Sequence, residues 1–145
     1  MTSHVRADDL VAIQLLIQRF AALTDIAEDI GPYLDMVTED AVFSYEPVAA
    51  IGWAGATYRG RDEIRAGVEQ RRADGIQGPG TRTVHIVSDI TIDLDDDDSA
   101  RVYAVWQFWG VNDAGPACLS IGQYENVVRR EDGVWRLARR ASRVL

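Results

Sequence analysis

The sequence has little of the chemistry on which many small sites depend. Its 145 residues include one cysteine, two histidines and no lysine. A single cysteine excludes an internal disulfide, and because Cys118 stands in an apolar run we predict a small buried side chain there. No Cys, His or carboxylate cluster has metal-ligand spacing, and no glycine-rich phosphate loop follows a strand. We therefore expect a site that uses neither a metal nor a cofactor.

Positive charge is also scarce, and this limits the partners. The formal net charge is −8, and all fifteen basic residues are arginines. Such a balance argues against a nucleic-acid partner, because phosphate binding uses clustered basic side chains. Basic residues gather only near the end, where they suit a solvated or interface strand face at least as well as an anion site: Arg136, Arg139, Arg140 and Arg143.

Long apolar runs are absent as well. No stretch of 18 apolar residues occurs, and the N-terminus lacks a signal-peptide pattern, so we expect no membrane association and a cytoplasmic location. A hydrophobic content of 47% nevertheless suffices for a packed core. Length and composition predict one domain over residues 1–145, with residues 1–7 as a frayed lead.

The order of predicted elements indicates an α+β fold. Apolar residues at helical spacing predict a long helix over about residues 8–28. After the Gly31-Pro32 break we expect, in order, a short helix at 33–37, a turn at 38–40, a strand at 41–45, an irregular loop at 48–57 and a helix at 61–73. Four strands should follow, at 81–94, 100–112, 117–130 and 134–144.

Helices followed by antiparallel strands favour a cone-shaped α+β barrel. In this architecture a curved, mostly antiparallel sheet wraps around the long N-terminal helix and leaves a pocket at its open end. Residues 102–106 are apolar on both strand faces, so part of the outer face should be buried in a homodimer or homotrimer. The acidic turn at 95–98 lacks the ligand spacing of a calcium loop and should be solvated.

His85 is the only histidine within the predicted elements, and its side chain can exchange a proton near neutral pH. The alternative is a structural or surface histidine. A regular strand from residue 81 would bury the even-numbered face and expose His85, unless a bulge or a covering partner reverses this. Asp25 follows Ala21 by four residues and so continues the buried stripe of the first helix, unless that helix frays and Asp25 caps a turn.

Several motifs together resemble the nuclear-transport-factor-2-like superfamily, and within it the SnoaL-like, polyketide-cyclase-like and scytalone dehydratase-like members. They cover nearly the whole chain and lie at residues 20–25 (FAALTD), 38–43 (TEDAVF), 58–64 (YRGRDEI), 81–85 (TRTVH) and 131–136 (EDGVWR). The resemblance implies the cone-shaped fold. It implies less about the reaction, because this fold hosts dehydratases, isomerases, cyclases, hydrolases and binding modules.

The likeness to scytalone dehydratase and bile acid 7α-dehydratase implies three catalytic positions. Asp25 would orient His85, His85 would act as general acid and base, and Tyr45 would donate a hydrogen bond to the carbonyl or enolate oxygen. The implied function is a cofactor-independent dehydratase for a small cyclic, aromatic or polyketide-like hydroxy-carbonyl compound. The sequence departs from scytalone dehydratase where Thr24 replaces a tyrosine, and where Gly110 and Tyr124 fall near its second histidine and its asparagine.

Two alternatives remain open. The sequence is also similar to ketosteroid isomerase, in which the catalytic base precedes a proline, as Glu46 does here, but Phe20 stands in place of the oxyanion tyrosine. Glu46 is thus either a base of an isomerase or cyclase that works through an enolate, or a strand-end residue facing water. The other alternative is a non-catalytic binding or assembly module, similar to the small β subunits of ring-hydroxylating dioxygenases.

Aromatic residues are the remaining candidates for a binding site. They could line a pocket for a small hydrophobic or aromatic molecule, or could simply pack in the core or an interface. The residues concerned are Trp53, Trp106, Phe108, Trp109 and Tyr124. Glu46 is expected beside them if it contacts a ligand.

Overall fold

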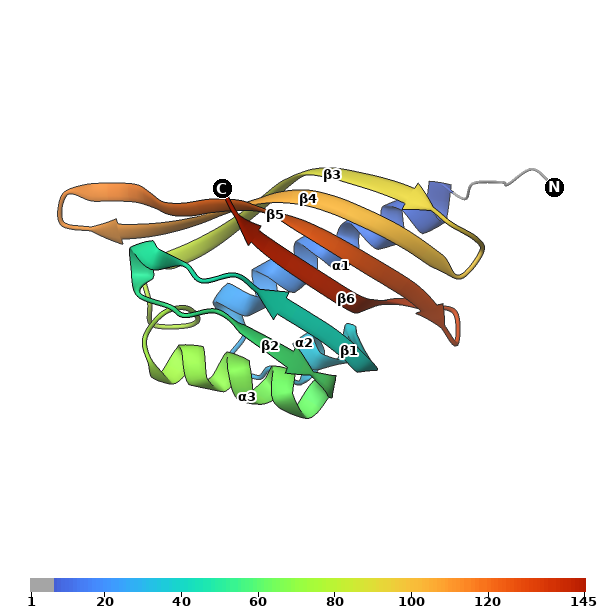
Figure 1. The fold of residues 1–145 in the computed structure, drawn as a ribbon, viewed down its shortest axis with the longest axis horizontal. Coiled ribbons are helices and arrows are strands. Elements are labelled where there is room, and N and C mark those ends of the chain that lie inside the picture. The colour runs from blue at the N-terminus through green and yellow to red at the C-terminus, as the bar shows by residue number, and fades with distance from the viewer. Residues whose placement is uncertain (1–6) are drawn as a thin grey trace.

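The computed structural model describes residues 7–145, which form three α-helices and a single six-stranded sheet (Figure 1). The helices are α1 (Ala7–Ile26), α2 (Gly31–Asp35) and α3 (Gly60–Ala73), with a short 3-10 helix, η1, at Ala49–Ile51. The strands are β1 (Val37–Tyr45), β2 (Ala56–Arg59), β3 (Thr83–Leu94), β4 (Ser99–Asn112), β5 (Gly115–Glu131) and β6 (Val134–Val144). No helix in this part of the chain is long and apolar enough to cross a membrane.

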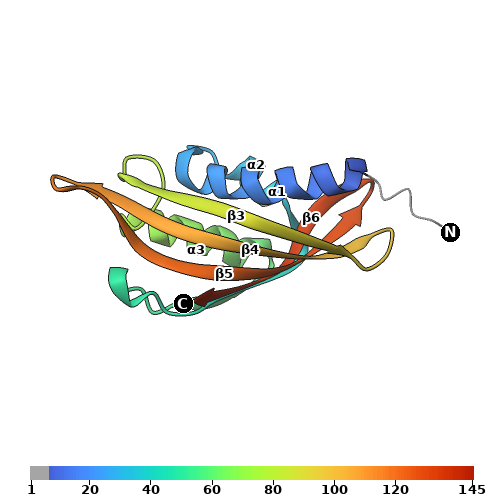
Figure 2. The ribbon, with the colours of Figure 1, turned by 90° about the horizontal axis from the view of Figure 1, so that it is seen from above.

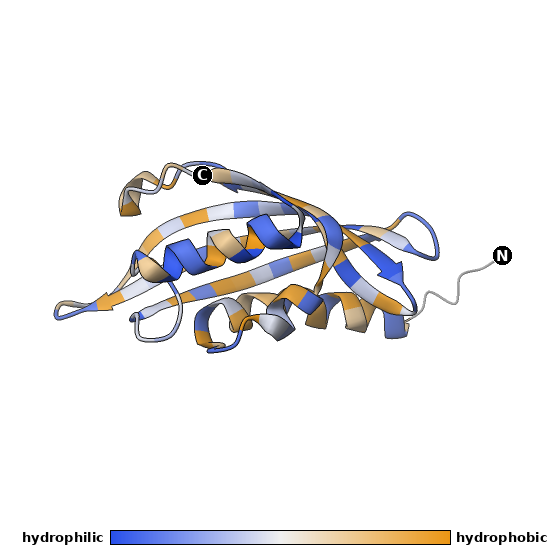
Figure 3. Cartoon of the chain, turned by 90° about the horizontal axis from the view of Figure 1, so that it is seen from below, coloured by the Kyte–Doolittle hydropathy of each residue, from blue (hydrophilic) through white to orange (hydrophobic). Residues whose placement is uncertain are grey.

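The sheet is curved and almost entirely antiparallel. Its strand order is β2-β1-β6-β5-β4-β3, and only the β1–β6 pair is parallel. Helix α1 runs along the concave side beside β3, and α3 covers β1 and β2 (Figures 1 and 2). Both helices lie on the same side of the sheet in Figure 3, where hydrophobic and hydrophilic residues alternate along the strands. The predicted α+β fold, with a curved sheet around the N-terminal helix, is confirmed.

The core forms where the apolar stripe of α1 meets the sheet. Ile13, Ile17 and Phe20 are buried at helical spacing, and each such side chain stabilises the fold by about 1.5–3 kcal/mol. The Phe20 ring stacks on Tyr33 at 4.0 Å between centroids and meets Phe43 edge-on at 5.7 Å. This packing fixes α1 against the start of the sheet, so the last turn of α1 has a defined place.

Two β-bulges change which side chains face inward. In β3 the pairing with β4 shifts between Ser88 and Thr91, and Asp89 adopts a left-handed φ of 51°. Odd-numbered residues such as His85 therefore point inward before the bulge, and even-numbered residues point inward after it. In β6 the pairing with β5 skips Ala138, so that Arg140 is buried in place of Arg139.

Some predicted boundaries were wrong. The polar segment 38–40 was expected to be a turn but belongs to β1, because the fully buried Thr38 continues the strand while Glu39 and Asp40 face solvent. The loop expected at 48–57 contains η1 and the start of β2. Cys118 was expected to be buried but is exposed, because the tip of the β4–β5 hairpin extends past the last pairing of β6. The frayed lead at residues 1–7 falls almost wholly outside the described residues.

Candidate active site

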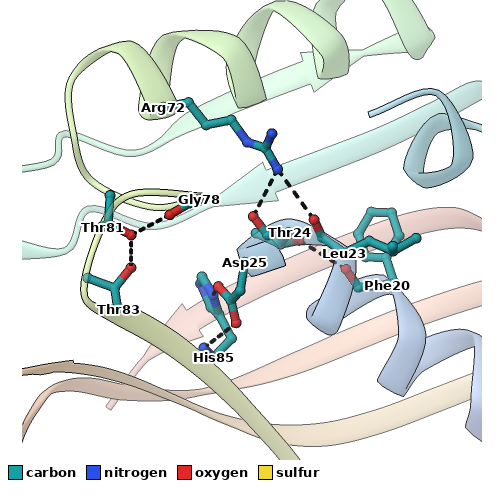
Figure 4. Close-up of polar contacts among 9 residues, drawn as sticks. All are labelled: Phe20, Leu23, Thr24, Asp25, Arg72, Gly78, Thr81, Thr83 and His85. Atoms are coloured by element: carbon teal, nitrogen blue, oxygen red, sulfur yellow. Dashed lines mark hydrogen bonds and ion pairs between the residues drawn. The ribbon is translucent and has the colours of Figure 1, made fainter. Parts of the chain in front are cut away.

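Asp25 and His85 form a close pair at the end of α1. One carboxylate oxygen of Asp25 lies 2.7 Å from His85 Nδ1, and the other accepts the backbone N–H of His85, also at 2.7 Å (Figure 4). The side chain of Asp25 is 6% exposed and that of His85 is 16% exposed. Both residues were predicted as site residues. His85 faces Asp25 because the bulge in β3 reverses which residues of the strand point inward.

Contacts from α3 hold the last turn of α1 in place. The guanidinium of Arg72 donates to the backbone carbonyls of Leu23 and Thr24, at 3.3 and 3.2 Å (Figure 4). It also donates to the carbonyl of Ala27, at 2.6 Å. A cation at this position binds carbonyls at the C-terminal end of the helix and interacts favourably with the helix dipole. Because Asp25 belongs to this turn, Arg72 helps to fix the carboxylate that meets His85.

His85 borders a small cavity of about 70 Å³ at the open end of the sheet. The predicted site residues on its wall are Tyr45, Glu46, Trp53, His85, Trp106, Phe108 and Tyr124. Asp25 lies behind His85, facing a separate depression between α1 and β3. Trp109 was expected to line the pocket but does not, and its indole N–H instead donates to Gln107 at 2.9 Å.

Tyr45 and Glu46 lie on the side of the cavity formed by the end of β1. The ring of Tyr45 is half-buried and packs near Trp53, with centroids 5.6 Å apart. Glu46 is exposed, and its carboxylate accepts the backbone N–H of Val144 at 3.2 Å. Glu46 thus stands at the rim, which agrees with the interpretation of a strand-end residue that faces water.

Two buried arginines on the cavity wall were not singled out as site residues from the sequence. Arg71 is 7% exposed and Arg140 is 4% exposed. Arg71 donates to the Tyr58 hydroxyl at 2.9 Å, and Arg140 donates from Nε to the side-chain oxygen of Asn126, also at 2.9 Å. The C-terminal arginine run was the available signal for Arg140, but regular alternation in β6 would have pointed Arg139 inward instead.

Two tyrosine hydroxyls near these arginines remain protonated at neutral pH. Burial raises the pKa of Tyr124 to about 12, more than the nearby Arg140 lowers it. Burial also raises the pKa of Tyr33 well above its usual range, and Tyr45 adds to this increase. Tyr33 and Tyr124 line the cavity, so both can donate a hydrogen bond to a ligand oxygen. Tyr33 had not been predicted as a site residue, because a tyrosine in a five-residue helix carries no sequence signal of this kind.

Glycines allow two close approaches that shape the cavity. A Cβ on Gly122 would lie 2.0 Å from the Arg143 carbonyl oxygen and 2.3 Å from the Trp106 ring. A Cβ on Gly67 would lie 2.5 Å from the ring of Tyr58, the partner of Arg71. Both glycines are therefore needed for the observed placement of these aromatic rings.

The arrangement around His85 suits proton transfer. Because a carboxylate oxygen can only accept, His85 Nδ1 carries the hydrogen toward Asp25, and the neutral ring has its lone pair on Nε2. The ring of Phe108 packs beside the imidazole at 4.7 Å between centroids. No group of three or more potential metal ligands occurs among residues 7–145. The described side chains thus offer an oriented imidazole beside an aromatic cavity.

Comparison with known proteins agrees with this fold. The profile of the SnoaL-like domain matches residues 5–141, and the chain belongs to this family. A search of curated proteins found no match. The predicted resemblance to SnoaL-like and scytalone dehydratase-like proteins is confirmed.

Three solved structures illustrate the relationship. A proposed scytalone dehydratase from Novosphingobium aromaticivorans is 25% identical, with a TM-score of 0.72 over 95% of this chain and 85% of that one. A proposed aromatic ring hydroxylase from the same organism is 27% identical, with a TM-score of 0.73 over 95% and 90%. A protein of unknown function with a cystatin-like fold from Nostoc punctiforme is 22% identical, with a TM-score of 0.78 over 99% and 96%, and it supports the fold alone.

Proposed function

We propose that this protein is a cofactor-independent lyase, a dehydratase for a small cyclic, aromatic or polyketide-like hydroxy-carbonyl compound. The observation that carries the proposal is the buried carboxylate of Asp25, which orients His85 at the cavity wall. A histidine held in one tautomer beside an aromatic cavity is suited to general acid–base catalysis. The similarity to a proposed scytalone dehydratase supports the same reaction class.

The proposed reaction uses His85 twice. Its Nε2 removes a proton from the carbon α to the carbonyl, and the C–H electron pair forms an enolate. The enolate then collapses to a conjugated C=C–C=O system as the β-carbon–oxygen bond breaks. The imidazolium returns its proton to the leaving hydroxyl, which departs as water, so no external oxidant, reductant or co-reactant is needed. Asp25 stabilises the imidazolium between the two steps, and Tyr45 donates to the enolate oxygen directly or through water.

A non-catalytic module is less well supported by the site. A binding or assembly protein could use Asp25 to anchor the backbone N–H of His85, but it would not require the second carboxylate oxygen to orient the imidazole at the cavity wall. An isomerase or cyclase that works through the same enolate is supported by one further observation. The hydroxyls of Tyr33 and Tyr124 line the cavity and supply donors that the sequence resemblance to ketosteroid isomerase lacked.

The test is a screen of cyclic β-hydroxy ketones as substrates. Formation of the conjugated enone is monitored by its ultraviolet absorbance. We expect turnover by the wild type and a loss of about 10²- to 10⁴-fold in kcat for His85→Gln, the usual contribution of general acid–base catalysis. Asp93→Asn, an exposed change on the same strand, is the control and should retain full activity. Enone formation that is unchanged in His85→Gln would reject the assignment.

We also propose that the protein is a homodimer or homotrimer. Several apolar side chains on the outer face of the sheet remain exposed, which supports burial by another copy of the chain. They are Val84, Ile86, Tyr103, Val111 and Ile121. Light scattering coupled to size exclusion should give two or three times the monomer mass, and Ile86→Glu should lower it; a monomeric wild type would reject the proposal.

A further inference from the structure

The two buried arginines of the cavity have no carboxylate partner within the described part of the chain. Among residues 7–145, the ion pairs of the structure include neither Arg71 nor Arg140. Glu46, which lies on the cavity wall, accepts the backbone N–H of Val144, and Asp25, which lies behind His85, is bound to that residue. Among the described residues, these two positive charges therefore have no anionic partner in the wall of one cavity, although the protein as a whole is acidic.

Each guanidinium has unused hydrogen-bonding capacity. A guanidinium carries five N–H donors. Among the described residues, Arg71 uses one of them, to the Tyr58 hydroxyl, and Arg140 uses one, to the side-chain oxygen of Asn126. Two more buried donors on the cavity wall have no partner among the described residues, Gln77 Nε2 and Trp106 Nε1. The cavity wall thus carries several donors that the described residues leave unpaired.

Aromatic rings stabilise these charges only in part. The guanidinium carbon of Arg71 lies 5.4–5.6 Å from the ring centroids of Tyr45, Trp53 and Tyr58. That of Arg140 lies 3.8 Å from the centroid of the Tyr124 ring. Cation–π contacts place and partly stabilise a guanidinium but form no hydrogen bond with it. The remaining guanidinium N–H groups can therefore bind an anion. Charge-assisted hydrogen bonds of this kind are strongest in a desolvated site.

We propose that the cavity binds a carboxylate, held by Arg71 and Arg140, and that the substrate is a small cyclic or aromatic acid. The inference rests on the proposed function in placing this carboxylate on the molecule that His85 acts upon. Paired N–H donors of a guanidinium match the planar, two-oxygen geometry of a carboxylate. Trp53, Trp106 and Phe108 supply the apolar wall against which a ring would pack.

Benzoate and its neutral isostere benzamide are the probes for this test. Titration calorimetry on the full-length protein should show saturable binding of benzoate, with benzamide weaker by about tenfold or more, the loss expected for one charge-assisted hydrogen bond. Arg71→Met and Arg140→Met should each weaken benzoate by a similar factor and remove its advantage over benzamide. Arg139→Met changes the exposed neighbour of Arg140 on β6 and should bind benzoate as the wild type does.

The wild-type comparison decides the proposal even if an arginine variant fails to fold. Equal binding of benzoate and benzamide, or no binding of benzoate, would overturn it. So would undiminished benzoate binding by a folded Arg71→Met, Arg140→Met double variant. These results are separate from the enone screen. If the protein prefers benzoate but turns over no ketone in the screen, the dehydratase proposal is rejected and the carboxylate site is supported. If it turns over neutral ketones but does not prefer benzoate over benzamide, the carboxylate site is rejected and the dehydratase proposal is supported.

Discussion

The carboxylate of Asp25 holds both the ring and the backbone of His85, a residue 60 positions away in the sequence. One oxygen fixes the imidazole, and the other satisfies a backbone N–H near the start of β3. The same side chain thus sets the tautomer of His85 and anchors the strand that carries it. A single substitution at Asp25 should therefore disturb both catalysis and stability.

Asp25→Asn tests this double role. In the amide only Oδ1 can accept, whereas Nδ2 donates, so the variant side chain cannot accept from both the backbone N–H and the ring Nδ1–H of His85 through separate atoms. The His85 ring should therefore become a mixture of tautomers, and kcat should fall by about tenfold or more. The free energy of unfolding should fall by about 1–3 kcal/mol, because a buried donor loses its partner. Ring ¹⁵N shifts measured by NMR report the tautomer, and Asp93→Asn is the control. Unchanged shifts in Asp25→Asn would contradict the orienting role.

The bulge in β3 offers a second test, at Asp89. This residue adopts a φ of 51°, a conformation that glycine tolerates and a β-branched residue does not. Asp89→Val should lower the free energy of unfolding by about 1–3 kcal/mol and reduce turnover, because the bulge aims His85 inward. Asp89→Gly should be close to neutral in both respects. Urea unfolding and the enone assay provide the measurements, and equal effects of the two substitutions would argue against the bulge as the cause.

The pKa of Tyr124 predicts a loss of stability at alkaline pH. An unfolded tyrosine ionises near pH 10, whereas Tyr124 in the folded protein ionises at about 12. The raised pKa therefore contributes stability that is complete below pH 10 and is lost as the pH rises toward 12. Between about pH 8 and pH 11 this group should remove about 1 kcal/mol from the free energy of unfolding.

Tyr124→Phe should remove this part of the pH dependence, and the exposed Tyr103→Phe should not. Urea unfolding at the two pH values measures the difference. A Tyr124→Phe variant with the same alkaline slope as the wild type would show that the hydroxyl is not protected by burial.

Gly122 tests the shape of the cavity. An added methyl would meet the backbone oxygen of Arg143, which cannot move easily, as well as the ring of Trp106. Gly122→Ala should lower the free energy of unfolding by about 1–3 kcal/mol and weaken ligand binding. Gly110→Ala is a matched control, because the closest atom to its methyl would be the flexible end of the Leu119 side chain, at 3.0 Å, and the backbone oxygen of Arg82 would lie at an ordinary contact distance. If the two variants unfold at the same urea concentration, the close approach at Gly122 has no energetic importance.

The sequence predicts the fold well because periodicity and turn residues are local signals. Helical spacing identifies α1 and places Asp25 on its buried side, and alternation identifies the four long strands. The resemblance to known families joins Asp25 and His85, which no local pattern could connect. Segment 38–40 was mistaken for a turn because its polar residues conceal a strand whose backbone continues through them.

The arginines of the cavity lay beyond sequence reasoning for a physical reason. Alternation in a strand predicts which side chains are buried only while the pairing register is regular. The bulge at Ala138 shifts the register of β6, so that Arg140 is buried and Arg139 is exposed. The same rule applied to β3 would have exposed His85. The sequence does not indicate that Arg71 lines the cavity either. An arginine in the last turn of a helix is common, because it interacts favourably with the helix dipole.

The measurement that tests the account most directly is deuterium exchange at carbon. A cyclic ketone acid that lacks the leaving hydroxyl cannot lose water, but it can still give up its α-proton to His85. Incubated in D₂O with the wild type, it should gain deuterium at the α-carbon, and His85→Gln should slow this gain by about 10²-fold or more. Exchange of equal rate in the two proteins, or no exchange above the uncatalysed rate, would contradict His85 as the base.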